Sequence, residues 1–171
     1  YADTSDALSS YGDREKKLEI LKDPHCGAFA VIRLCTYFLA YFCVAFCIRF
    51  SPRVGLCWTL ALVLERGLSG LAVAAFPMAK NTGLAHTFAT AADRESVQKI
   101  LIVLSVLLAA ALIALGGGAL VAAALLVLWR YHHVAVKEFG GITGDLAGWF
   151  LQKAEFWMLA ALAASQWGGI L

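Results

Sequence analysis

Two carboxylates near the start of the sequence have the spacing of a metal-binding pair. Asp3 and Asp6 are three residues apart, so a helix places both on one face, within reach of a common cation. Mg²⁺ suits such a pair, because proteins hold it through one or two carboxylates together with substrate phosphates. A solvated helix start with an aspartate cap would look the same. We treat Asp3 and Asp6 as candidate metal ligands and catalytic residues.

A basic amphipathic segment follows at residues 13–23 and stops at Pro24. Its side chains Arg14, Lys17 and Lys22 could bind phosphate oxygens, the arginine as a fork and the lysines as point charges. A cytoplasmic helix lying at the membrane interface, with no substrate, accounts for the same composition.

The loop Gly-Gly-Ile-Thr-Gly-Asp at 140–145 is a candidate phosphate cradle. Three glycines let the backbone approach a ligand closely, successive N–H groups can form an anion-binding nest, and the loop leads into a helix N-terminus, which favours phosphate. The threonine hydroxyl and the aspartate could reach a metal; the alternative is an ordinary loop in which the aspartate caps the helix. The candidate residues are Gly140, Gly141, Thr143, Gly144 and Asp145.

Two charges stand in the middle of an apolar stretch. Glu65 and Arg66 would each cost at least about 2.5–3.5 kcal/mol at the centre of a membrane. Neighbouring residues point about 100° apart on a helix, so we expect each to face the bundle or a cavity rather than the other. A transporter would use such residues too.

The composition excludes several classes of protein. Hydrophobic residues make up 61% of the 171 residues and charged residues 15%, with a mean hydropathy of +0.74, whereas a soluble domain carries about 25% charged residues. A net charge of +2, without a basic run that interleaves aromatics, argues against a nucleic-acid partner. The five cysteines contain no CxxC pair, and we read them as small buried apolar residues.

The apolar stretches predict an all-α fold, a polytopic membrane helix bundle with about five spans, because a span needs about 20 apolar residues. We expect one integral-membrane domain over 1–171, with an amphipathic cytoplasmic helix in an acidic and basic segment at 1–27. The predicted spans are 28–50, 54–77, 98–115, 118–134 and 147–167.

Positive charges in the connections decide how the long uncharged stretch at 100–129 folds. A hairpin at Gly116–Gly118 puts nine lysines and arginines on one side against Arg49 and Arg53 on the other, and one tilted helix gives seven against four. Lys and Arg gather in cytoplasmic loops, so we predict the hairpin and a cytoplasmic side that holds 1–27, 80–99 and 130–146. Eleven of the twelve carboxylates lie on that side or at its border.

With these residues in view, the chain resembles the cobalamin synthase family, the integral-membrane adenosylcobinamide-GDP ribazoletransferases. The run from Ala2 to Asp23, followed by Gly27, resembles the family's acidic block, and the 140–145 loop with Gly148 and Glu155 resembles its C-terminal signature. Arg66, Ser69, Pro77, Lys80, Gly83 and Phe88 also fall where the family has a span ending in a proline, a basic residue and a glycine-containing loop. The acidic block usually begins upstream of Ala2, so we expect a fragment that lacks an N-terminal portion.

The resemblance implies transfer of phosphocobinamide from adenosylcobinamide-GDP to the 5′-hydroxyl of α-ribazole, giving adenosylcobalamin and GMP, with Mg²⁺, in the inner cell membrane of a prokaryote. The 5′-phosphate of α-ribazole is an alternative partner. Membrane lipid would surround the protein, and a homo-oligomer is compatible with the sequence. A solute transporter and a lipid-headgroup CDP-alcohol-type phosphotransferase are the alternatives. The metal ligands and catalytic residues would be Asp3, Asp6 and Asp145. Substrate binding is assigned to Arg14, Lys17, Lys22, Asp23, Arg66, Lys80, Gly140, Gly141, Thr143, Gly144 and Glu155, with Arg66 and Glu155 at the membrane border.

Overall fold

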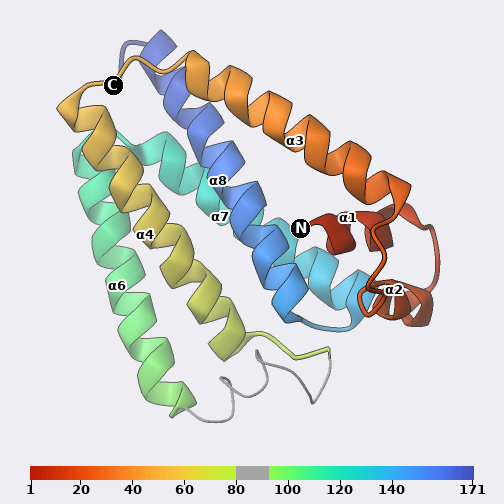
Figure 1. The fold of residues 1–171 in the computed structure, drawn as a ribbon. Coiled ribbons are helices and arrows are strands. Elements are labelled where there is room, and N and C mark those ends of the chain that lie inside the picture. The colour runs from red at the N-terminus through yellow and green to blue at the C-terminus, as the bar shows by residue number, and fades with distance from the viewer. Residues whose placement is uncertain (80–92) are drawn as a thin grey trace.

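The computed structural model describes residues 1–79 and 93–171, and this part of the chain is helical between short connections (Figure 1). The all-α prediction is confirmed. The elements are α1 (Ala2–Ser9), α2 (Arg14–Ile20), α3 (Ala28–Phe46), α4 (Pro52–Ala75), α6 (Arg94–Ala114), α7 (Gly118–Val134), the π-helical turn η1 (Ala135–Phe139) and α8 (Gly144–Trp167). The long helices begin and end within four residues of the predicted spans.

Among the described residues, four segments are long and apolar enough to cross a membrane: α3, α4, α6, and α7 continued through η1. The fifth predicted span, α8, is 24 residues long but is not among them, since Gln152, Lys153 and Glu155 interrupt its apolar sequence. It packs instead against α7, α4, α3 and α1, in the middle of the bundle (Figure 1).

The ends of the long helices follow from local chemistry. The Ser51 hydroxyl accepts a hydrogen bond from the Val54 N–H at 3.2 Å, and Pro52 fits the first turn because its missing N–H would be unpaired there anyway. The hairpin at Gly116–Gly118 is confirmed: α6 ends at Ala114, and Gly116 has a φ of +87°. A side chain at Gly116 would meet the Arg53 guanidinium at 2.8 Å.

Hydrogen bonds sort the connections into two ends of the bundle. We call one end the rim, which comprises residues 1–27, 76–79, 93–94 and 135–145. There the Arg94 guanidinium donates to the Ala74 carbonyl, and the Ile142 N–H donates to the Pro77 carbonyl. At the other end, Gln166 exchanges two hydrogen bonds with the Arg49 backbone. Figure 1 shows α1, α2 and the start of α8 together at the rim. The helices thus run in the directions that the hairpin prediction requires.

Small residues line the helix contacts of the core. Ala61 and Ala72 of α4, Ala124 of α7 and Ala154 of α8 are almost fully buried. Lipid tails are as apolar as leucine, so close packing rather than apolar burial holds membrane helices together, and small side chains permit that approach. The outer faces of α3 and α6 expose large apolar residues such as Phe42 and Leu107. The cysteine prediction was wrong for four of the five, since Cys57 alone is buried.

Candidate active site

The first helix of the rim is fixed to α3 through Asp6. The Asp6 carboxylate accepts a hydrogen bond from the Ala30 N–H at 3.3 Å, which satisfies a donor in the first turn of α3. Gly27, the N-cap residue of α3, has no side chain of its own to do this. A Cβ at Gly27 would lie 2.1 Å from Asp6 Oδ2, so this contact requires glycine. The alternative in which an aspartate caps the start of the first helix is wrong, because Tyr1 is the N-cap residue of α1 and Asp6 caps α3 instead.

The three candidate metal ligands do not form a ready-made site. Asp3 and Asp145 are exposed at the rim, and the chain as described, 1–79 and 93–171, contains no group of three or more His, Cys, Asp or Glu side chains that could hold a metal ion. One reason is that Asp6 turns toward α3. A magnesium ion here would take most of its ligands from a phosphate-bearing substrate and from water.

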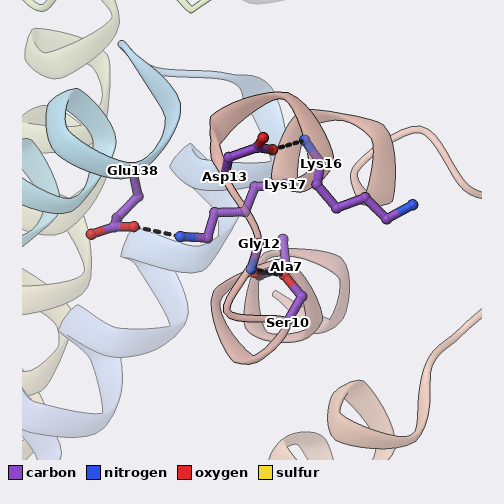
Figure 2. Close-up of polar contacts among 7 residues, drawn as sticks. All are labelled: Ala7, Ser10, Gly12, Asp13, Lys16, Lys17 and Glu138. Carbon is purple, nitrogen blue, oxygen red and sulfur yellow. Dashed lines mark hydrogen bonds and ion pairs between the residues drawn. The ribbon is translucent and has the colours of Figure 1, made fainter.

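The basic segment comes together at the rim with η1 and the glycine loop, and Figure 2 shows its contact with η1. Lys17 of α2 is buried, and its ammonium donates to the Glu138 carboxylate of η1 at 2.5 Å. Arg14, also on α2, lies against Gly140: a Cβ there would be 2.7 Å from a guanidinium nitrogen. Asp13 caps α2 by accepting from the Lys16 N–H at 2.9 Å. Segments more than 120 residues apart therefore form one surface.

The loop is less open than a phosphate cradle would be. The N–H groups of Gly140, Gly141 and Ile142 donate to the carbonyls of Val136, Ala135 and Pro77. A side chain at Gly141 would meet the backbone of Pro77 and Met78 at 2.5 Å. The cradle prediction was wrong for these N–H groups, because the glycines serve packing: Gly140 has a φ of +78° and Gly141 of +153°.

The N-terminus of α8 is the part of the loop region whose backbone N–H groups could still bind an anion. Thr143 is the N-cap, its hydroxyl accepting from the Leu146 N–H at 3.2 Å, so the alternative with Asp145 as cap is wrong and Asp145 stands exposed in the first turn. The first N–H groups of a helix have no partner within it, which leaves those of Gly144 and Asp145 to face solvent or a ligand. No atom of another residue lies within 4 Å of a Cβ built at Gly144.

Lys22 and Asp23 lie in the turn after α2. Lys22 is exposed, whereas Asp23 accepts hydrogen bonds from the His25 N–H at 2.9 Å and from the His25 ring at 2.7 Å. These bonds lower the pKa of the Asp23 carboxyl, the backbone N–H contributing most. Asp23 therefore stabilises the turn in which it lies. Lys80 lies outside the described residues.

Arg66 and Glu155, which we predict at the membrane border, lie well inside their helices. Arg66 is nine residues from the end of α4 and Glu155 eleven from the start of α8, about 14 and 16 Å along the helix axes. Glu155 accepts a hydrogen bond from the Tyr41 hydroxyl at 2.8 Å. Glu65 is fully buried, and both carboxylate oxygens lack a hydrogen-bond partner in the described structure; Arg66 approaches at 3.6 Å, contrary to our expectation that the two face apart.

A cavity of about 1140 Å³ between α1, α3, α7 and α8 reaches the rim at Lys17 and Glu138. Sequence reasoning missed three cations that line it: Arg33, Arg130 and Lys153. Each lies within the rim half of its helix. A signal was present in the sequence, since all three are charges in or next to predicted spans, where charges are expensive.

Comparison with known proteins assigns the chain to a family. A family model described as cobalamin-5-phosphate synthase matches residues 1–163. The chain belongs to this family. The cobalamin-5-phosphate synthase match covers both rim motifs, the acidic and basic run of 2–23 and the loop of 140–145, so the resemblance seen in the sequence is confirmed.

Curated relatives carry the name adenosylcobinamide-GDP ribazoletransferase. The protein from Lachnoclostridium phytofermentans is 41% identical over 166 residues, which are 95% of this chain and 62% of the relative. Those from a Geobacillus species and from Pseudomonas syringae are each 32% identical over 164 residues, covering 92% and 95% of this chain and 62% and 66% of the relatives. The chain therefore spans a little under two thirds of their length. No solved structure matches the chain.

Proposed function

We propose that the rim is a phosphoryl-transfer site at which phosphocobinamide passes from adenosylcobinamide-GDP to a ribose hydroxyl of α-ribazole or of its 5′-phosphate, with release of GMP. The observation that carries this proposal is the contact of the basic segment with η1 and with the glycine loop that follows it, Lys17 with Glu138 and Arg14 with Gly140. Family membership supports it, as do the names of the curated relatives.

Phosphoryl transfer asks the protein mainly to position its reactants and to neutralise charge. The exposed cations Arg14 and Lys22 supply positive charge at the rim for the diphosphate. The free N–H groups at the start of α8 supply donors aligned with the helix dipole. Lys17 acts differently from the other two: its ammonium is engaged by Glu138, so it positions α2 against the loop.

Two exposed carboxylates remain for the reacting groups. Asp3 and Asp145 would hold Mg²⁺, with Asp6 on the same face of α1 as Asp3. The ion would supply positive charge that polarises the diphosphate and stabilises the departing GMP. Either exposed carboxylate could accept the proton of the attacking hydroxyl.

We also place this rim on the cytoplasmic face of a prokaryotic inner membrane, because nine lysines and arginines lie in the connections on its side and two on the other, and such residues gather in cytoplasmic loops.

The purified chain in detergent or nanodiscs tests the proposal directly. Incubated with adenosylcobinamide-GDP, α-ribazole and Mg²⁺, it should release GMP and form adenosylcobalamin in equal amounts, both measured by chromatography. The reaction should stop when Mg²⁺ is chelated.

Asp145→Asn should lower the rate at least about 100-fold, the scale of one lost catalytic group. The matched control is Glu95→Gln, which also changes an exposed carboxylate in the first turn of a helix and should leave the rate unchanged. Equal rates for Asp145→Asn and the unmodified chain would remove Asp145 from the site. Uptake of a solute into vesicles without GMP release would favour the transporter instead.

A further inference from the structure

The cavity beside α8 is strongly cationic. Four cations line it, Lys17, Arg33, Arg130 and Lys153, against one carboxylate, Glu138. Lys17 and Glu138 neutralise each other at 2.5 Å. Within the described residues, no carboxylate forms an ion pair with Arg33, Arg130 or Lys153. Three positive charges from three helices therefore share one cavity without a counter-charge.

These cations are close enough to repel one another. The charges of Arg33 and Arg130 both act on Lys153, whose ammonium lies 5.6 Å from the centre of the Tyr1 ring. Burial of the Tyr1 hydroxyl raises its pKa, so this phenol stays neutral at physiological pH and supplies no negative charge. Uncompensated cations beside a hydrocarbon layer are costly. The cavity is therefore built for an anion.

Away from the rim, the cavity is apolar and follows α8. Beyond the cations it is lined by Val127 of α7 and by Ala160, Ala161 and Ala164 of α8. Ala164 lies eleven residues past Lys153, about 16 Å along the helix, which is close to half of the roughly 30 Å hydrocarbon layer.

The cavity also opens onto the lipid-facing surface. Phe29, Leu126 and Trp157 line it and are each more than half exposed. A ligand could therefore enter sideways from the bilayer without passing through the rim. A free phosphate would satisfy the cations but leave the apolar half unfilled, whereas an anionic lipid matches both halves.

We propose that this cavity binds an anionic phospholipid, with its phosphate against Arg33, Arg130 and Lys153 and one acyl chain along the alanines of α8. The site lies beside the rim and shares Lys17 and Glu138 with it, so the bound lipid would also brace α3 against α7 and α8. The proposal does not depend on the reaction at the rim.

Native mass spectrometry of the purified, delipidated chain tests the site. Phosphatidylglycerol should bind at least ten-fold more tightly than phosphatidylcholine with the same acyl chains. The double variant Arg33→Gln/Lys153→Gln should weaken phosphatidylglycerol binding about 30-fold, the effect of two cations at a membrane surface, and leave phosphatidylcholine binding unchanged. The control Lys99→Gln removes an exposed cation outside the cavity and should have no effect.

A second pair of variants tests the apolar half. Ala164→Trp places a large side chain in the cavity and should weaken binding of both lipids, whereas Ala122→Trp, at an exposed position of α7 outside it, should not. Equal affinity for the two lipids, or an unchanged affinity in the double variant, would overturn the proposal. The proposal would also be overturned if inorganic phosphate displaced phosphatidylglycerol at a similar concentration and Ala164→Trp had no effect on binding. The site would then bind free phosphate. If Ala164→Trp does not fold, the double charge variant decides.

Discussion

At the scale of single residues, the glycines of the two rim motifs are explained by the side chains and backbone that occupy the space of a missing Cβ. Asp6 fills that space at Gly27, Arg14 at Gly140, and the Pro77–Met78 backbone at Gly141. These glycines look like a phosphate-binding signature in the sequence, yet in the fold they let segments distant along the chain touch. Their first role is to assemble the rim.

Gly27→Ala should therefore destabilise the protein. The new Cβ would lie 2.1 Å from the Asp6 carboxylate, and overpacking of this kind costs about 1–3 kcal/mol. Gly148→Ala is the control: Gly148 lies in α8 just beyond the rim, no atom outside its own helix and chain neighbours lies within 4 Å of a Cβ built there, and in a helix interior alanine is favoured by roughly 0.5–1 kcal/mol. Thermal unfolding in detergent, followed by circular dichroism, measures both. A lower Tm for both variants alike would refute the contact-based explanation.

At the scale of elements, the ion pair between Lys17 and Glu138 joins α2 to η1 across 121 residues of sequence. Both side chains are largely shielded from water, with 11% and 29% of their surfaces exposed. A shielded ion pair is weakly stabilising as a whole but costly to break on one side, because the remaining charge loses its partner.

A double-mutant cycle with Lys17→Met and Glu138→Gln should give a coupling free energy of about 1 kcal/mol or more. The pair Lys16–Glu19, with both side chains more than half exposed, supplies the matched cycle and should show much weaker coupling, because solvent screens it. Unfolding in sodium dodecyl sulfate, followed by circular dichroism, provides the free energies. Equal coupling in the two cycles would mean that the contact does not hold α2 to η1.

The elements themselves could be predicted from the sequence more fully than their contacts. The apolar runs and the glycines near 116 indicate where helices begin and end, because turns are local chemistry. The cap of α8 was assigned to the wrong residue, since Thr143 rather than Asp145 is its N-cap. The partners of Asp6 and Lys17 could not be predicted, since they depend on which helix faces meet. In a membrane, spans are apolar on most sides, so the hydrophobic pattern says little about those faces. The cations of the cavity were missed for the same reason.

At the scale of the whole molecule, the connections divide between a rim and an opposite end, and the cysteines offer a direct probe of that division. Cys26 lies at the rim and Cys47 at the other end, and both are exposed. Variants that keep one of them, with the other four cysteines changed to serine, should react with a membrane-impermeant maleimide from opposite sides. Inverted vesicles should label Cys26 and right-side-out vesicles Cys47. Labelling of both from one side would contradict the arrangement.

The central claim is that the basic segment meets η1, the turn that leads into the glycine loop, at one end of the bundle. In a cysteine-free background, Lys17→Cys with Glu138→Cys tests it through cross-linking by a short bifunctional maleimide, read as a mobility shift on a gel. The account predicts rapid intramolecular cross-linking of this pair and of Arg49→Cys with Gln166→Cys at the opposite end, and none for Lys17→Cys with Arg49→Cys. Cross-linking at the opposite end, with none between positions 17 and 138, would contradict it.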